Sequence, residues 1–268
     1  MDDAKPLALV TGASSGIGFE LAKQFADNGF DLLLTAEDDE LQQAADEIRG
    51  SGAHVVAVVQ VDLAERGGVG QLYDAVTAVG RPLAAAALNA GVGKGGPFVD
   101  TPLEDEIRVI DLNITSTVRL AKRILPDMVR SGAGKVLFTS SIAATIPGSF
   151  QAVYNASKSF VQSFAQALQN ELKDTDLTIT VLMPGPTETE FFERADMEDT
   201  KVGTQNKDDA VQVARDGFDA LMSGTKKVVA GSAKTKTQGL ANKVLPDSSK
   251  AAAHRKMAEP GSAGDHQR

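Results

Sequence analysis

The strongest constraint on the fold is a short apolar run that passes directly into a glycine-rich loop and then into a helical pattern. Residues 7–10 read Leu-Ala-Leu-Val, residues 11–18 read Thr-Gly-Ala-Ser-Ser-Gly-Ile-Gly, and apolar residues at helical spacing continue to Asn28-Gly29. Strand, glycine loop and helix in this order open a βαβ unit, the building block of a parallel sheet. We therefore expect an α/β fold rather than hairpins or a helical bundle.

Strand and helix patterns then alternate through most of the chain. We predict further strands over residues 30–35, 54–60, 82–88, 136–139, 177–183 and 227–230, and helices over residues 38–49, 65–79, 103–130, 150–172 and 208–222. No internal repeat or linker divides them, and 268 residues have room for one large domain but not two. The predicted fold is a single doubly wound, Rossmann-like parallel sheet with helices on both faces, over residues 1–230.

Composition excludes several classes of function. The net charge is −9, which argues against nucleic acid as a partner. No apolar stretch is long enough to span a membrane, and Met1-Asp2-Asp3 is unlike a signal segment, so we expect no membrane partner and a cytoplasmic protein. There is no cysteine and the three histidines are scattered, so we expect no disulfide and no bound metal.

The charge is unevenly distributed along the chain. Residues 226–268 contain nine Lys or Arg and three Asp or Glu, a net charge of +6, which leaves −15 for the remainder. A basic end of this kind can dock on an acidic body, but a solvated end is the usual behaviour of termini. We expect residues 231–268 to form a basic extension that is partly helical or disordered.

The glycine spacing suits a bound dinucleotide. Gly12 permits a tight turn, Gly16 lets the backbone approach a pyrophosphate, and Gly18 lets the helix pack closely on the strand. The alternative is a purely structural glycine turn, because the spacing is Gly-x-x-x-Gly-x-Gly rather than Gly-x-Gly-x-x-Gly. The predicted cofactor residues of this loop are Gly12, Ser14, Ser15, Gly16, Ile17 and Gly18.

Acidic residues follow the second and third predicted strands. Glu37, with Asp38 beside it, can accept hydrogen bonds from the adenosine ribose and repel a 2′-phosphate, or can simply open the next helix. Asp62, followed by Leu63, can accept a hydrogen bond from an adenine amino group or cap a helix, and the two interpretations carry equal weight. The acids favour NAD as cofactor, with NADP left open.

Two further turns lie where later strands end, and a third segment follows them. Asn89-Ala90-Gly91 brings the backbone close to the cofactor edge of the sheet, and Pro184-Gly185 forces a turn where a nicotinamide would lie. Thr187 or Thr189 can hydrogen-bond the nicotinamide carboxamide or the pyrophosphate. Residues 190–206, with aromatic residues among acids, suit a mobile flap over the substrate.

Residues 134–160 carry the candidate chemistry. Ser141 ends a predicted strand, and Tyr154 and Lys158 lie one turn apart on the same face of the following helix. A free Tyr titrates at about 10, and a nearby cation favours the phenolate, so we expect Lys158 to lower the pKa of Tyr154. Asn113 is a poor helix former within a predicted helix, so we expect something to use its side chain, with a local bend or a surface position as the alternative.

Together these motifs resemble the short-chain dehydrogenase/reductase (SDR) family over roughly residues 6–230. In this family the active Ser precedes the Tyr by thirteen residues, which selects Ser141 over Ser140. The resemblance implies that Tyr154 is the acid/base, Lys158 lowers its pKa and binds the nicotinamide ribose, Ser141 polarises the carbonyl, and Asn113 holds a relay water. It also implies a homo-oligomer, a tetramer or a dimer, paired through the helix that bears Tyr154.

The predicted function is therefore that of an oxidoreductase. It would transfer a hydride between a nicotinamide dinucleotide and a small secondary alcohol or ketone, with Tyr154 as general acid or base. Two alternatives stay open: an NADPH-linked ketoreductase of acyl substrates, and a dinucleotide-sensing protein without catalysis. The four polar candidates, Asn113, Ser141, Tyr154 and Lys158, argue against the sensor, which would need none of them.

Overall fold

A computed structural model describes residues 5–242 and 245–266 of the chain. Seven parallel strands form one sheet in the order β3-β2-β1-β4-β5-β6-β7. The strands are β1 (Leu7–Thr11), β2 (Asp31–Ala36), β3 (Val55–Gln60), β4 (Leu83–Leu88), β5 (Gly134–Thr139), β6 (Leu177–Pro184) and β7 (Lys227–Ala230). The predicted doubly wound parallel sheet is confirmed, with every predicted strand in it.

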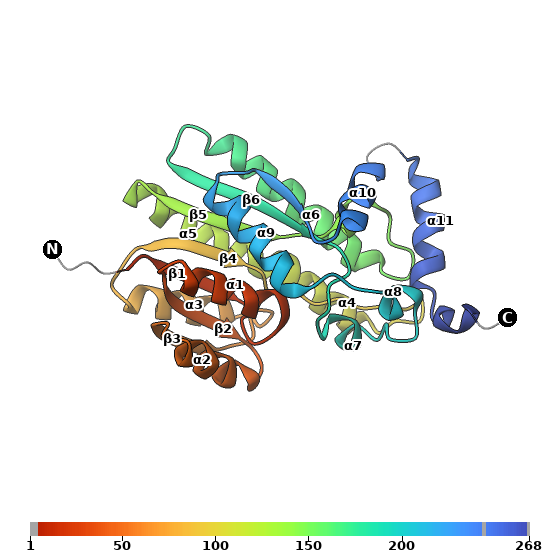
Figure 1. The fold of residues 1–268 in the computed structure, drawn as a ribbon, viewed down its shortest axis with the longest axis horizontal. Coiled ribbons are helices and arrows are strands. Elements are labelled where there is room, and N and C mark those ends of the chain that lie inside the picture. The colour runs from red at the N-terminus through yellow and green to blue at the C-terminus, as the bar shows by residue number, and fades with distance from the viewer. Residues whose placement is uncertain (1–4, 243–244, 267–268) are drawn as a thin grey trace.

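Two helical layers cover the sheet (Figure 1). One apolar core packs α1 (Gly16–Asp27), α2 (Glu40–Gly50) and α9 (Ala210–Met222) on one face. A second core packs α3 (Gly68–Ala78), α5 (Thr117–Ser131) and α6 (Ala152–Glu171) on the other. Because both faces are covered, β1 is entirely buried and reads as an uninterrupted apolar run rather than an alternating one.

Two predicted helices differ from the structure in instructive ways. The helix predicted over residues 103–130 is α4 (Leu103–Ile110), a π-helical turn η1 (Asp111–Ser116) and α5. The helix predicted from residue 150 begins at Ala152, because Phe150 has a φ of +64°, a left-handed conformation that no helix admits. Both departures lie beside the candidate site.

The remaining elements gather beyond the carboxyl ends of the strands, at one end of the molecule (Figure 1). They are the short turns η2 (Ile142–Thr145) and η3 (Ser262–His266) and the helices α7 (Phe191–Arg194), α8 (Lys201–Thr204), α10 (Ala233–Ala241) and α11 (Asp247–Ala258). Within the described residues no helix has the length and apolar character required to cross a membrane.

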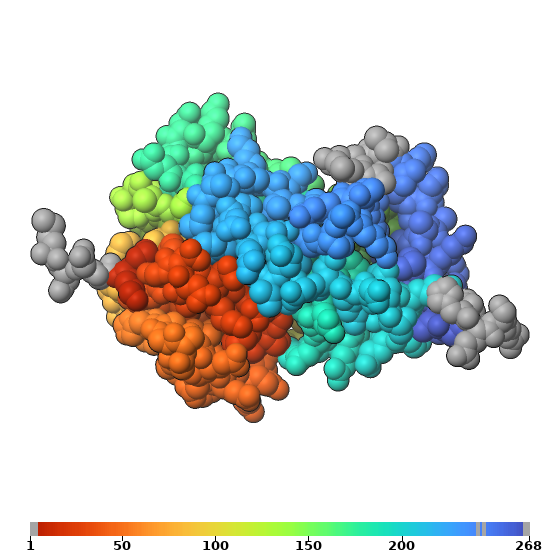
Figure 2. Space-filling view, in the orientation of Figure 1, coloured from red at the N-terminus to blue at the C-terminus, as the bar shows by residue number. Residues whose placement is uncertain are grey.

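The basic extension packs on the rest of the chain. Thr235, Asn242, Ala258 and Ser262 are buried, and Ala263 N–H donates to the Asp199 carbonyl over 2.9 Å. In Figure 2 the C-terminal residues lie directly against the surface formed by residues near 200. The extension contains the helices α10 and α11 and docks on the chain's own body, the alternative that the sequence analysis left open, because the contacts that hold it come from residues distant in sequence. Residues 1–4, 243–244 and 267–268 lie outside the described part.

Candidate active site

A cavity of about 540 Å³ opens at the carboxyl ends of the central strands. β1 and β4 are neighbours, so the chain winds in opposite directions on either side of them, which is where ligands bind in sheets of this kind. Every residue predicted to bind the cofactor lines this cavity: Gly12, Ser14, Ser15, Gly16, Ile17, Gly18, Glu37, Asp62, Leu63, Asn89, Ala90, Gly91, Tyr154, Lys158, Pro184, Gly185, Thr187 and Thr189.

The glycine loop is packed so tightly that side chains have no room. A Cβ atom on Gly18 would lie 1.8 Å from the carbonyl oxygen of Gly12, so α1 starts in direct contact with the loop. Gly12 has a φ of +65°, and a Cβ on Gly16 would lie 2.7 Å from Cγ2 of Thr189. The loop therefore leaves backbone N–H groups at a helix N-terminus facing the cavity, as an anionic pyrophosphate requires.

Asn89 ties three strands together at the floor of the cavity. Its Nδ2 donates to the Thr11 carbonyl over 3.2 Å, and its backbone N–H donates to Thr11 Oγ1 over 2.9 Å. Its Oδ1 accepts from the Thr139 hydroxyl over 3.1 Å. The turn that follows β4 is thus held against the ends of β1 and β5, which places the Ala90-Gly91 backbone at the cavity.

Glu37 and Asp62 are joined by a cation that the sequence analysis did not single out. Arg108, on α4, donates to Glu37 and to Asp62 Oδ2, the latter over 2.9 Å. Asp62 Oδ1 also accepts from the backbone N–H of Ala64 over 2.8 Å, so the capping interpretation of Asp62 is seen directly. Its contact with adenine stays a prediction.

Asp38 lies at the same end of the cavity and is also paired. Its Oδ2 accepts from the Ser14 hydroxyl over 2.9 Å and from Arg194 over 3.4 Å. Its Oδ1 is buried and has no hydrogen-bond partner among the described residues. The glycine cradle fits a dinucleotide, whose pyrophosphate would face the backbone N–H groups of the loop.

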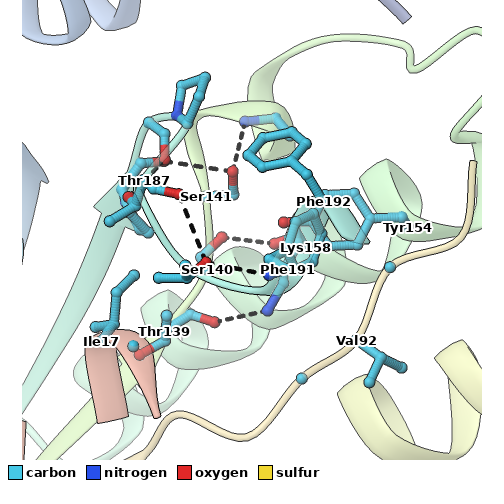
Figure 3. Close-up of a pocket in the computed structure, with 18 of the residues that line it drawn as sticks. Ile17, Val92, Thr139, Ser140, Ser141, Tyr154, Lys158, Thr187, Phe191 and Phe192 are labelled. Atoms are coloured by element: carbon cyan, nitrogen blue, oxygen red, sulfur yellow. Dashed lines mark hydrogen bonds between the residues drawn. The ribbon is translucent and has the colours of Figure 1, made fainter. Parts of the chain in front are cut away.

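Ser141, Tyr154 and Lys158 face the same cavity (Figure 3). Ser141 follows β5; its Oγ accepts from the Ala143 N–H over 3.1 Å and donates to the Pro184 carbonyl over 3.4 Å. Lys158 Nζ donates to the Thr139 carbonyl over 3.2 Å. Ser140, by contrast, donates its hydroxyl to the Lys158 carbonyl over 2.8 Å and serves the packing of α6. Ser141 is thus the serine left to serve a ligand.

The pKa values of Tyr154 and Lys158 differ from our expectation. Burial raises the pKa of Tyr154 to about 12, although a hydrogen bond with Ser141 lowers it. Burial also lowers the pKa of Lys158 to about 8. The prediction that Lys158 lowers the pKa of Tyr154 is therefore wrong for the protein alone. The Lys158 ammonium hydrogen-bonds Thr139 and lies 5.8 Å from the centre of the Tyr154 ring, and desolvation outweighs its attraction for a phenolate.

Asn113 lies behind the cavity and does not line it. Its Nδ2 donates to the Val92 carbonyl and to Ser157 Oγ, both over 2.9 Å, and its Oδ1 accepts from the Val92 N–H over 2.9 Å. The expectation that its side chain has a partner is confirmed, and the π-helical turn η1 is what directs it inward. Asn113 positions the loop after Gly91, and the relay water stays a prediction.

The segment predicted as a flap covers the cavity. The Phe191 ring lies 5.1 Å from the Tyr154 ring, and its Cζ would be 2.5 Å from a Cβ on Gly93. Glu190 accepts from the Ser15 hydroxyl over 3.5 Å, and Arg194 reaches Asp38. This segment thus spans from the substrate end of the cavity to the cofactor loop.

The sequence analysis did not predict that α11 forms one wall of the cavity. Lys250, Ala253, His254 and Met257 line the cavity, and their spacing places them on one face of a helix. Gln151, just before α6, lines it as well. The signal for α11 was present in the helical spacing of these residues, but Ala, Lys and His form too weakly apolar a stripe to stand out.

The fold and site define a dinucleotide-binding α/β protein with a Ser, Tyr and Lys set at the cofactor edge of its sheet. A family model described as short chain dehydrogenase matches residues 6–200. The chain belongs to this family, whose enzymes are oxidoreductases that use NAD or NADP.

Relatives and solved structures agree with this assignment. The chain is 32% identical over 235 residues to dehydrogenase/reductase SDR family member 7B of Rattus norvegicus, covering 83% of this chain and 72% of the relative. A short-chain dehydrogenase from Sphingobium yanoikuyae in complex with NADPH is 29% identical, with a TM-score of 0.78 over 84% of this chain and 87% of that one. An SDR from Burkholderia phymatum in complex with NAD, 23% identical, shares the fold with a TM-score of 0.79 over 90% and 92%.

Proposed function

We propose that the protein transfers a hydride between a nicotinamide dinucleotide and a secondary alcohol or ketone, with Tyr154 as general acid or base. The observation that carries the proposal is that Ser141, Tyr154 and Lys158 line the same cavity as the glycine loop. Ser141 follows β5, Tyr154 and Lys158 lie on α6, and the loop follows β1, so segments far apart in the chain bring these groups to one cavity.

Each side chain has a role that its surroundings support. The bound dinucleotide supplies or accepts the hydride at its nicotinamide ring. In reduction, Ser141 Oγ hydrogen-bonds the carbonyl oxygen and Tyr154 gives that oxygen a proton. The raised pKa of Tyr154 keeps the phenol protonated at neutral pH, which suits this direction. In oxidation the proton moves the other way, and Lys158 holds positive charge beside the phenol.

The test is the Tyr154→Phe variant. We expect it to bind the dinucleotide as the wild type does but to lose turnover by more than the ~10²- to 10⁴-fold typical of one acid/base group, because hydride and proton transfer are coupled. Tyr73→Phe is the matched control, since Tyr73 bonds Asp127 over 2.6 Å and does not line the cavity. Normal turnover of Tyr154→Phe on an alcohol or ketone would refute the assignment.

We propose NAD as the preferred cofactor. Glu37, Asp38 and Asp62 outnumber Arg108 and Arg194 at the ribose end of the cavity, and their net negative charge opposes a 2′-phosphate. A second candidate, NADPH-linked reduction, has a specific observation in its favour: Arg108 is a cation beside Glu37, and the Sphingobium relative binds NADPH. Comparing the KM values for NADH and NADPH distinguishes them, and a lower KM for NADPH would overturn the preference.

We also propose that the protein forms a homo-oligomer through α4 and α6. Leu103 and Ile107 on α4 are 66% and 43% exposed, and Phe160 on α6 is 39% exposed, beside the exposed Phe98 and Val99. Apolar residues in such numbers on one side favour a protein partner. Light scattering of the wild type and of Leu103→Glu tests this proposal, and an unchanged monomeric mass for both would refute it. The cytoplasmic location stays a prediction.

A further inference from the structure

The cavity extends to α11, and its lining includes polar side chains that the proposed chemistry does not use, among them His254 and Gln151. α11 is held against the segment before α6, since Ser149 Oγ donates to the Ala251 carbonyl over 3.4 Å and Arg255 lies 5.0 Å from the centre of the Phe150 ring. The far wall of the substrate compartment is thus built by the C-terminal extension.

His254 on α11 presents an acceptor to this compartment. Its Nδ1 lies 3.0 Å from the Ser149 carbonyl oxygen, which can only accept, so Nδ1 carries the hydrogen. Burial lowers the pKa of His254, so the ring is neutral at pH 7. Nε2 of a neutral ring with Nδ1–H holds a lone pair, and it has no partner among the described residues.

Gln151 provides the second group. Its side chain lines the cavity, the residue is only 6% exposed, and its amide has no hydrogen-bond partner within the described chain. Gln151 lies one helical turn before Tyr154 and two residues after Ser149, the residue that holds His254. Phe150, between Ser149 and Gln151, has a φ of +64°, a strained conformation that the fold retains.

The charged residue that α11 contributes to this wall is already paired. Lys250 Nζ donates to the Thr145 carbonyl over 3.1 Å and pairs with Asp247 Oδ1 over 2.6 Å. It therefore does not offer its charge to a ligand. Apolar side chains also line the cavity, from Ile142, Ile146, Phe191, Phe192 and Met257.

We infer that the substrate carries a second, uncharged hydroxyl on an apolar body, which donates to His254 Nε2 and accepts from the Gln151 amide. A carboxylate or a ketone cannot donate to Nε2, whereas a hydroxyl can satisfy both side chains at once. The preferred substrates are then diols and hydroxyketones. This inference rests on the proposed function, because it names the substrate of the same site.

The experiment compares matched alcohols with NAD and NADP. The pairs are cyclohexanol with 1,3- and 1,4-cyclohexanediol, and 2-octanol with 2,7-octanediol. We expect the wild type to give a kcat/KM at least ~10-fold higher for the better diol of a set, since one hydrogen bond to a buried partner is worth about that factor. His254→Asn keeps an N–H for Ser149 and removes the acceptor at Nε2, and Gln151→Leu removes the amide.

His254→Asn and Gln151→Leu should each lower the ratio of diol to monoalcohol kcat/KM by ~10-fold, mainly through KM. Lys256→Ala, on the exposed side of α11, should leave the ratio unchanged. A wild type that uses both alcohols equally, or prefers a hydroxy acid or an amino alcohol, overturns the inference but leaves the proposed function intact. A wild type that binds the dinucleotide but turns over no alcohol or ketone overturns the proposed function itself.

Discussion

Replacing Lys158 by Met should stabilise the folded protein at neutral pH although it removes a group that we propose to act in catalysis. Lys158 is 5% exposed, and burial lowers its pKa from 10.5 to about 8. At pH 7 the folded protein therefore holds a charge in a site that disfavours it. Methionine has a similar length and no charge to desolvate.

The sign and size of this stability change follow from proton linkage. Because the folded pKa is below the unfolded one, the unfolded chain binds more protons between pH 8 and 10.5, so stability rises with pH across that window and is lost as pH falls through about 8. The cost of the buried charge is about 3 kcal/mol at pH 7 and about 1 kcal/mol at pH 10. Leaving the Thr139 carbonyl without its donor costs ~1–3 kcal/mol at every pH.

The change of this stability difference with pH is the sharper test. The lost hydrogen bond costs the same at every pH, so it cancels from that change. Urea denaturation of the wild type and Lys158→Met between pH 7 and 10 should show the stability difference shifting by about 2 kcal/mol in favour of the wild type. Tyr154 retains its proton throughout this range in both proteins, because its folded pKa is about 12. Lys122→Met, at an exposed position, controls for a lost surface charge. A difference independent of pH would refute the reasoning.

Two further predictions concern packing around the cavity. Gly18→Ala should lower the free energy of unfolding by ~2 kcal/mol or more and abolish dinucleotide binding, because its Cβ would lie 1.8 Å from the Gly12 carbonyl oxygen; Gly70→Ala, in α3 with open space around it, should instead stabilise by ~0.5–1 kcal/mol. Equal Tm values for the two variants would contradict this account. Phe191→Ala should lower the pKa of Tyr154 from about 12 toward 10, because the phenol loses its apolar cover. Phenolate absorbance in a Tyr73→Phe background reports Tyr154 alone, since the chain has two tyrosines, and an unchanged midpoint would show that other residues bury the phenol.

Several parts of the site were predictable from the sequence because they depend on neighbours along the chain. A strand that is buried on both faces is mostly apolar, and a helix that starts in contact with its preceding loop needs glycine at Gly18, so both are visible in the local sequence. Tyr154 and Lys158 share a face because four residues span about one helical turn. These regularities also predicted the parallel sheet and the loop that lines the cavity.

Other features depend on contacts between residues far apart in sequence, and only the tertiary structure decided them. The pKa of Tyr154 is raised by burial in the assembled site, and the partners of Glu37 and Asp38 are arginines from α4 and α7. The basic extension becomes a wall of the cavity because Ser149 and Asp199 supply its hydrogen bonds. The local sequence pattern determined which helices and strands form and what their ends can bind. Desolvation and charge pairing depend on what surrounds a group in space, so only the tertiary structure decided them.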